Sequence, residues 1–426
     1  MGCLSGAGWS SLHYYPDFPE LKALPMPTRE ELLRRYGDAL EDIPIVTNRN
    51  TGFRGPRGLN RVNPVDVGRL DRWIKDLSDR GGRLAERPLA AYTLPGAHDA
   101  MTYAFRSNWA YRKTGWSLFS PARGGTRTQS INLTAMFELG IRYFDIRVEK
   151  SGDKLYGFHG PITLTGDRAD NAIRALFHMA VERKEPIVIK FDYKSSSTFP
   201  LVKRIVDNFA THVMPVSAYW NASVGECISQ GKVLCLFHKA KKKLRKKYGD
   251  EVDELGDYST HKAGGFTNTH NMKKHQAKLE ALIEQQVEGE KLKVMSLNIP
   301  CVPTKMSTIG MTVVNALLLN IPGTLYKGGQ ILVRRREQDR WIGHYKSVQS
   351  IEKSEVTRTI NRQFVQKLQR YVDSWYTTLE EQQPQAILDR LAGDITKHVA
   401  GAVGMDFVNN KRGLVLDLVE LNNRDF

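Results

Sequence analysis

Two spacings of apolar residues alternate along the chain beyond residue 66. Short runs rich in Val, Ile, Phe and Tyr are typical of strands buried in a parallel sheet. They predict strands over residues 89–94, 141–148, 186–193, 232–237, 293–299 and 400–408. Longer stretches between them have apolar residues every three or four positions, which predicts helices. These stretches are residues 167–184, 199–213, 271–286 and 355–379.

The alternation of strands and helices predicts a parallel α/β architecture. The number of alternating units favours a distorted (β/α)8 barrel of the TIM type over an open sheet. We assign residues 67–426 to this barrel domain, which opens with a helix that includes Val67, Leu70, Ile74 and Leu77. Residues 1–66 combine proline turns, one short helical run and a Gly/Arg/Asn-rich stretch, so they predict a largely irregular N-terminal extension.

The longest apolar stretch, residues 307–326, is interrupted by Asn315, Asn320 and Pro322. Polar residues and proline at these positions argue against a membrane-spanning helix. We expect a barrel helix followed by a loop. The alternative is an element that inserts into a membrane interface.

The charge balance is strongly basic, with 62 Lys plus Arg against 46 Asp plus Glu and a net charge of +16. Such a surplus favours a polyanionic partner, namely nucleic acid, an acidic membrane surface or a phosphorylated ligand, although it also raises solubility. The lysine-rich residues 238–265 predict a solvated loop or helix end, or alternatively a patch for anionic lipid at the barrel mouth. Aromatic residues do not alternate with these lysines, which argues against a nucleic-acid partner.

The N-terminus lacks the basic start and apolar run of a secretory signal. Gly2 and Cys3 suggest acylation, but Gly6 stands where the myristoylation pattern has Ser or Thr. We therefore expect a cytoplasmic or peripheral membrane protein, with non-classical secretion as the alternative. The cysteines are too few and too scattered for a disulfide framework and suggest a reducing compartment; they are Cys3, Cys227, Cys235 and Cys301.

Polar residues follow or end several of the predicted strands, where barrel enzymes build their active sites. They are His98, Asp99, Asp145, Arg147, His159 and Asp406. Two histidines can serve as base and acid in the cleavage of a phosphodiester, because both protonation states of imidazole are accessible near neutral pH. A guanidinium can neutralise two phosphate oxygens at once, and Arg147 can fill this role.

A metal-dependent site is the alternative, since Asp99, Asp145 and Asp192 offer three carboxylates. Arg147, close to Asp145, places a cation where a metal would otherwise lie, so we expect no cofactor and keep calcium as the alternative. The chain has no GxxxxGK[ST], GxGxxG, HExxH or GxSxG motif.

Several segments resemble the X-domain of phosphatidylinositol-specific phospholipases C, in the bacterial and trypanosome-type single-domain branch. They are LPGAHDAMTY (94–103), TQSINLTAMFELGIRYFDIRVE (128–149), LYGFHGPITL (155–164), RWIKDL (72–77) and VGMDFVNN (403–410). The resemblance covers roughly residues 68–415. It implies a TIM-type barrel and a metal-independent reaction.

The resemblance also implies residue roles. His98 would be the general base, His159 the general acid and Arg147 the phosphate-binding residue. Asp99 would support the acid side of the site, and Asp406 would orient His98. Substrate binding would fall to His238, Lys239, Asp192 and Lys190.

The chain departs from the family pattern at several positions. Ala97 and Ala100 replace hydroxyl residues of the family's PGTHDS motif, and residues 105–125 are an insertion rich in aromatic and basic residues. His238 or a neighbouring lysine stands where bacterial members have an arginine for inositol. Asp192 stands where metal-independent members often have lysine, which favours the calcium alternative.

We therefore predict a phospholipase C-type phosphodiesterase that cleaves phosphatidylinositol or a glycosylated derivative to diacylglycerol and a (cyclic) inositol phosphate. We expect a monomer that binds an anionic phospholipid surface and no nucleic acid. The alternatives are a metal-dependent phosphodiesterase for another lipid headgroup and a non-catalytic barrel that binds anionic lipid.

Overall fold

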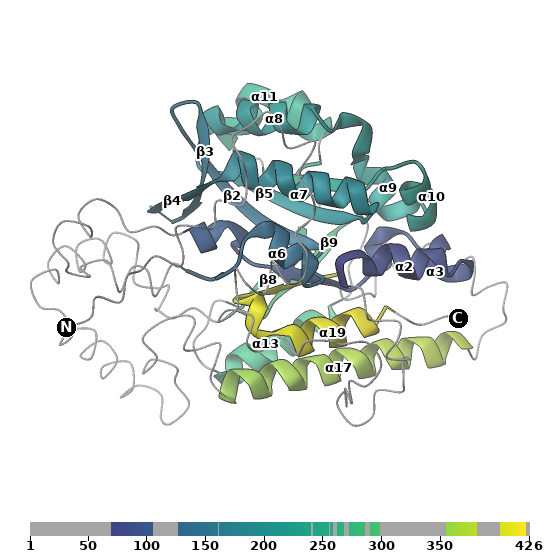
Figure 1. The fold of residues 1–426 in the computed structure, drawn as a ribbon. Coiled ribbons are helices and arrows are strands. Elements are labelled where there is room, and N and C mark those ends of the chain that lie inside the picture. The colour runs from purple at the N-terminus through teal and green to yellow at the C-terminus, as the bar shows by residue number, and fades with distance from the viewer. Residues whose placement is uncertain are drawn as a thin grey trace, which may run out of the picture.

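The computed structural model describes residues 70–104, 127–160, 162–239, 242–254, 256–258, 262–267, 272–285, 290–298, 355–380 and 401–422. The predicted N-terminal extension (1–66), the insertion at 105–125 and the apolar stretch at 307–326 lie outside the described residues. Figure 1 shows one curled sheet with helices around it.

Parallel strands follow one another around the sheet in chain order. They are β1 (Leu94–Ala97), β2 (Tyr143–Ser151), β5 (Ile187–Tyr193), β7 (Leu234–Lys239), β8 (Lys262–Phe266), β9 (Leu292–Ser296) and β10 (Ala402–Met405). The last strand, β10, pairs in parallel with the first, β1, which is the closure expected of a barrel. The barrel-type α/β fold predicted from the sequence is thus confirmed.

The barrel is distorted in two ways. Among the described strands, β7 and β8 do not pair, and only an isolated bridge between His238 and Asp257 lies at this opening. A two-residue strand, β6 (Val213–Met214), pairs with the start of β7 and does not separate β7 from β5. The opening lies beside the carboxyl end of β7, where the chain turns into α11 (Lys242–Glu254).

A hairpin extends from the carboxyl end of β2. Strand β3 (Lys154–His159) runs antiparallel to β2, and β4 (Ile162–Arg168) runs antiparallel to β3. Gly152 makes the turn between β2 and β3 with φ of 63°, which glycine adopts without strain. The hairpin returns His159 to the mouth of the barrel.

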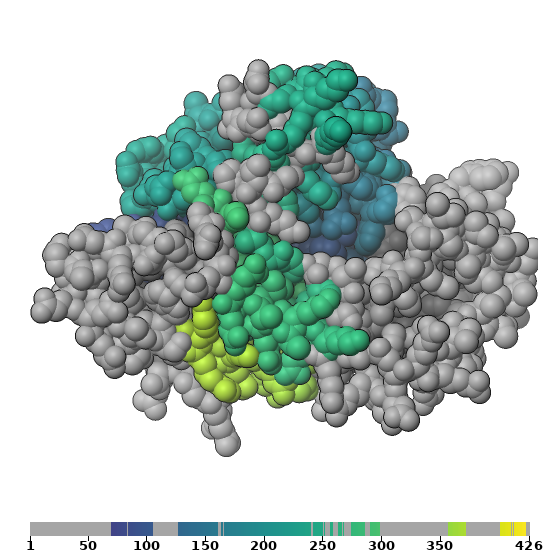
Figure 2. All heavy atoms as spheres, turned by 180° about the vertical axis from the view of Figure 1, so that it is seen from behind, coloured from purple at the N-terminus to yellow at the C-terminus, as the bar shows by residue number. Residues whose placement is uncertain are grey.

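Helices cover the outside of the sheet. Those with the predicted positions are α2 (Trp73–Asp79), α7 (Ala169–Arg183), α8 (Phe199–Asp207), α13 (Met272–Glu284) and α17 (Glu355–Glu380). Further helices are α3 (Gly82–Glu86), α6 (Leu133–Glu138), α9 (Val216–Asn221), α10 (Val224–Ser229) and α19 (Arg412–Glu420). Helix α17 packs against α13 and α19, and Figure 2 shows α13 and α17 side by side on the surface. None of the described helices is long and apolar enough to cross a membrane.

Three predicted elements differ from the structure. Residues 89–94 predict a strand, but Leu89–Ala91 is a 3-10 helix and β1 occupies Leu94–Ala97. This strand needs glycine at Gly96, because a Cβ there would lie 2.7 Å from the Tyr143 ring. The helix predicted over 199–213 ends at Asp207 and is followed by a 3-10 turn and β6. The segment 238–265 contains a helix, α11, because Leu244 and Tyr248 give it an apolar face that packs on the domain.

Candidate active site

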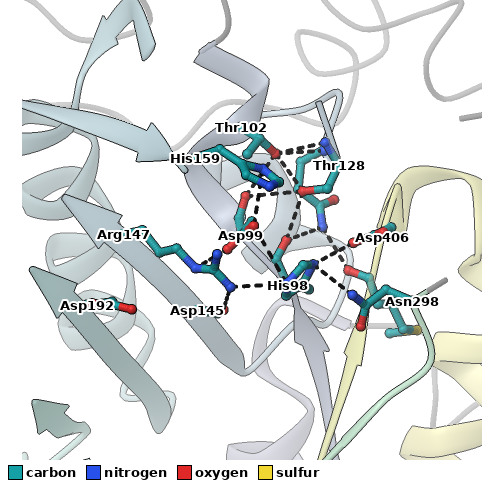
Figure 3. A network of polar contacts seen from close by, with 12 residues as sticks. His98, Asp99, Thr102, Thr128, Asp145, Arg147, His159, Asp192, Asn298 and Asp406 are labelled. Carbon is teal, nitrogen blue, oxygen red and sulfur yellow. Dashed lines mark hydrogen bonds and ion pairs between the residues drawn. The ribbon is translucent and has the colours of Figure 1, made fainter. Parts of the chain in front are cut away.

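His98 lies directly after β1 and beside Asp406, which directly follows β10. The parallel register pairs Ala97 with Met405, and the His98 amide donates to the Met405 carbonyl at 3.0 Å. This register brings His98 Nδ1 to 2.8 Å from Asp406 Oδ1 (Figure 3). Asn298, just beyond β9, places its Nδ2 3.2 Å from the same ring nitrogen.

The tautomer of His98 follows from its two charged neighbours. A carboxylate only accepts hydrogen bonds, so Nδ1 carries the proton and donates to Asp406. Arginine only donates, so Nε2 accepts from Arg147 Nη2 at 3.2 Å. His98 therefore presents its Nε2 lone pair to the site, as a general base must.

Nearby carboxylates raise the pKa of His98. Burial alone lowers this pKa, but the charges of Asp99 and Asp406 and the hydrogen bond to Asp406 outweigh burial, and Arg147 opposes them only in part. The protonated form of His98 is therefore stabilised, which suits a group that accepts a proton.

Asp99 links the two histidines and the arginine. Its carboxylate pairs with Arg147 Nε, and its Oδ2 lies 3.3 Å from His159 Nδ1 and 3.6 Å from His98 Nε2. The residue adopts a left-handed backbone with φ of 44° and is 2% exposed. Such a conformation costs of order 1 kcal/mol outside glycine, although aspartate tolerates it better than most residues. The strained turn aims the carboxylate into the site.

Arg147 is held between acidic partners on the inner face of the sheet. Its Nη2 lies 3.1 Å from Asp145 Oδ2, and Lys190 Nζ donates to Asp145 Oδ1 at 2.6 Å. Burial alone raises the pKa of Asp145, but Lys190 and Arg147 outweigh burial and hold it well below its usual range. The pKa of Arg147 is raised, because its neighbouring carboxylates outweigh the effect of burial. Both groups are charged at any pH near neutrality.

Gln129 joins the ends of β1 and β10, and sequence reasoning did not single it out. Its Nε2 donates to the carbonyls of His98 (3.0 Å) and Met405 (2.8 Å), and its Oε1 accepts from the Val408 amide (3.2 Å). Gln129 is fully buried. It therefore fixes the distance between the segments that carry His98 and Asp406. Its place in the TQSI segment was the available signal.

His238 and Lys239 lie on opposite faces of β7. In the parallel register, Arg147 is the neighbour of Asp192, and Asp192 is the neighbour of Lys239, so these three side chains lie on one face of the sheet. On this face, Lys239 Nζ donates to Asp192 Oδ2 at 2.7 Å. His238 is fully buried on the other face, where it stacks on Phe191 and Tyr193 and contacts the Tyr193 hydroxyl. Burial lowers the pKa of His238 to about 3.

The chain resembles proteins of known function over part of its length. No family model matches it. A 1-phosphatidylinositol phosphodiesterase of Listeria monocytogenes is 32% identical over 147 residues, 33% of this chain and 40% of the relative. A PI-PLC X-box domain-containing protein of Dictyostelium discoideum is 26% identical over 130 residues, 28% of this chain and 16% of the relative.

Part of the chain is thus similar to a phosphatidylinositol phosphodiesterase and to a PI-PLC X-box domain-containing protein. This confirms the resemblance carried by the sequence motifs. The matched segments span 40% and 16% of the two relatives' lengths.

Solved structures of similar proteins include a phosphatidylinositol-specific phospholipase C from Listeria monocytogenes, with a TM-score of 0.45 and 14% identity over 84% of this chain and 100% of that chain. Another, from S. aureus, has a TM-score of 0.46 and 13% identity over 83% of this chain and 98% of that chain.

The site gathers most of the residues that the sequence singled out. His98, Asp99, Arg147, His159 and Asp406 lie within one network of direct contacts (Figure 3). Asp145 and Lys190 join it through Arg147, while Asp192 and Lys239 form a pair on the same face of the sheet. His238 is the exception, because its place in the β7 register turns it away from this face.

The carboxylates suggested as calcium ligands already have cationic partners in the chain. Among the described residues, the group whose ligand atoms lie within 4.8 Å of one another is His98, Asp99 and Asp145, and Asp192 is not in it. Arg147 pairs with Asp99 and Asp145, Lys190 pairs with Asp145, and Lys239 pairs with Asp192. A divalent cation would meet strong repulsion from these groups, so the residues present do not fit a calcium site.

Proposed function

We propose that the chain cleaves the phosphodiester of phosphatidylinositol, or of a glycosylated derivative, at this site and without a metal ion. The convergence of two imidazoles and one guanidinium on the Asp99 carboxylate carries the proposal. The similarity to the Listeria phosphodiesterase supports the substrate class. The cationic partners of the carboxylates support the absence of a metal.

In the proposed first step, His98 Nε2 takes the proton of the inositol 2-hydroxyl. The hydroxyl oxygen attacks phosphorus, and the bond to the diacylglycerol oxygen breaks. His159 gives its proton to that leaving oxygen, so that diacylglycerol and a cyclic inositol phosphate form. Asp406 stabilises the imidazolium of His98 through the 2.8 Å hydrogen bond. In a slower second step, water can open the cyclic phosphate with the histidine roles reversed.

Arg147 stabilises the charge on the non-bridging phosphate oxygens. Without substrate, Arg147 Nη2 donates to His98 Nε2. When substrate binds, Arg147 Nη2 donates to the phosphate instead, and His98 Nε2 accepts from the inositol hydroxyl. Asp99 and Asp145 hold the guanidinium in place from behind. Lys239, Asp192 and Lys190 provide polar groups on the same face for the hydroxyls of the headgroup.

Paired histidine variants test the proposal. We expect His98→Ala and His159→Ala each to lower the hydrolysis of phosphatidylinositol vesicles by about 10²- to 10⁴-fold, the usual contribution of a general acid or base. His212→Ala is the matched control, because His212 is also part-buried but contacts the Gly231 carbonyl, away from the site. Thermal unfolding checks that all three variants fold. Activity near that of the wild type in either site variant contradicts the mechanism.

A further inference from the structure

The first half of α11 carries a dense set of cations. Lys242, Lys243, Lys246 and Lys247 are exposed, and Leu244 between them is buried. In a helix, Lys242 and Lys246 lie one turn apart, opposite to Leu244 and Tyr248. The lysines therefore share an outward face while the apolar residues hold the helix to the domain.

This helix stands at the rim of the barrel mouth. It follows β7 by a short link, and Lys239 at the end of β7 belongs to the candidate site. Helix α11 packs on the 3-10 turn Ser196–Thr198, which follows β5, and Tyr248 contacts Phe199 with ring centroids 5.2 Å apart. Figure 1 shows α11 beside α8 at the upper edge of the molecule.

The first turns of a helix are an unfavourable place for so many cations. Positive charges in the first turns of a helix oppose its dipole, and like charges at i and i+4 destabilise it. Arg245 pairs with Asp257. Within the described part of the chain, no ion pair involves the four exposed lysines, and the one contact recorded for them is Lys247 with the Tyr248 ring at 5.1 Å. An anion from outside the chain can supply compensation for these charges.

We propose that the lysine face of α11 binds the headgroups of an anionic phospholipid bilayer and so sets the barrel mouth against the membrane. The inference rests on the proposed function, because a lipid substrate requires the mouth to reach a bilayer. A nucleic acid fits less well, because the ring of Tyr248 packs against Phe199 and offers no stacking surface between the lysines.

Vesicle binding by the full chain tests this surface. Each lysine near an anionic bilayer strengthens binding by roughly fivefold. Lys242→Gln together with Lys246→Gln should therefore weaken binding to phosphatidylcholine vesicles that contain phosphatidylserine by roughly 30-fold. The matched control is Lys184→Gln with Lys291→Gln, which removes the same charge from exposed positions just before β5 and β9, at the other end of the barrel. We expect the control to bind like the wild type.

Two outcomes of this binding measurement overturn the proposal. One is equal binding by the α11 variant and the control. The other is capture of a polynucleotide by the wild type with no binding to the anionic vesicles. These vesicles contain no inositol lipid, so the result does not depend on the proposed reaction.

A second measurement separates membrane binding from catalysis. On short-chain phosphatidylinositol dispersed as monomers, the α11 variant should turn over substrate at the wild-type rate, while its rate on anionic vesicles falls with binding. An equal loss on both substrates would place the lysines in the active site or the fold and would overturn the surface assignment. Absence of turnover by the wild type on either substrate would defeat the proposed reaction, while the vesicle-binding result would stand by itself.

Discussion

Two arginines, Arg142 just before β2 and Arg147 in the middle of β2, show how the same residue type serves structure in one place and chemistry in another. Arg142, which precedes β2, is fully buried and pairs with Glu185 at 2.6 Å. Its remaining donors bind backbone carbonyls of Leu70, Phe137 and Ile141. Glu185 in turn accepts from backbone amides of α2.

Arg147 has a different kind of environment. Its side chain is 24% exposed, and its partners are the side chains of Asp99, Asp145 and His98. Backbone partners cannot be exchanged without unfolding, whereas a contact to an imidazole can be replaced by a contact to substrate. A partly exposed guanidinium with side-chain partners thus marks the reactive end of the barrel, and a fully buried one with backbone partners marks the structural end.

The substitution Arg147→Lys tests the reactive end of the barrel and should have a large effect on activity. Lysine keeps the charge but loses the planar fork that meets two oxygens of a phosphate. We expect phosphatidylinositol hydrolysis to fall about 100-fold, with the midpoint of thermal unfolding almost unchanged. Steady-state rates on vesicles measure the first effect and calorimetry the second. Full activity would remove Arg147 from the reaction.

The same substitution at the other end, Arg142→Lys, should reverse the pattern. Lysine cannot supply donors to all three carbonyls, and an unsatisfied buried carbonyl destabilises by about 1–3 kcal/mol. We expect the free energy of unfolding to fall by about 3 kcal/mol in urea titrations. The activity of the folded protein should stay within twofold of the wild type. A large loss of activity without loss of stability would contradict the structural assignment.

A second pair of variants tests the two ends of β1. Gln129→Met removes the side chain that ties His98 to Met405 and Val408, and Asn422→Leu removes the side chain that binds both backbone groups of Thr93. We expect both variants to be less stable. Only Gln129→Met should lower kcat, by about tenfold with little change in KM, because His98 and Asp406 lose their fixed separation.

The titration of His98, followed by NMR, distinguishes positioning from general destabilisation in this pair. Its pKa should fall in Gln129→Met and stay raised in Asn422→Leu. Equal kinetic losses in the two variants, with unchanged His98 titration, would show that Gln129 acts on the fold alone.

The smallest expected effect is a shift in pH dependence on Asp406→Asn. His98 must be neutral to act as base, so kcat/KM of the wild type should rise with pH through the raised pKa of His98. Loss of the Asp406 charge should move this acidic limb to lower pH. Protonated His98 also stabilises the fold below pH about 6.5, and this contribution is lost as pH rises through the raised pKa. A limb that stays in place would contradict the coupling to Asp406.

Local patterns were enough to predict most of the barrel. Apolar runs located β2, β5, β7, β9 and β10 to within a few residues, because strands buried on both faces are continuous in sequence. Strand β1 was placed too early, because its sequence contains Pro95 and Gly96, which are poor strand formers. The close approach of Tyr143 explains Gly96, and this contact is invisible in the local pattern.

Site residues at the ends of strands could be predicted from the sequence. Residues whose side of the sheet depends on the strand register could not. His98, Arg147 and Asp406 follow from strand ends and family motifs. His238 and Lys239 are neighbours in sequence, and a one-residue register decides which of them faces the site. Gln129 and Asn298 contact His98 from distant parts of the chain, so no local spacing could reveal their partners.

The most direct test of the account is hydrolysis of phosphatidylinositol vesicles by the purified wild-type protein in excess chelator, with the soluble products followed by phosphorus NMR. We expect a cyclic inositol phosphate in the absence of metal, at a rate that added calcium does not change. Product that forms only after calcium is added, or no product under either condition, would contradict it.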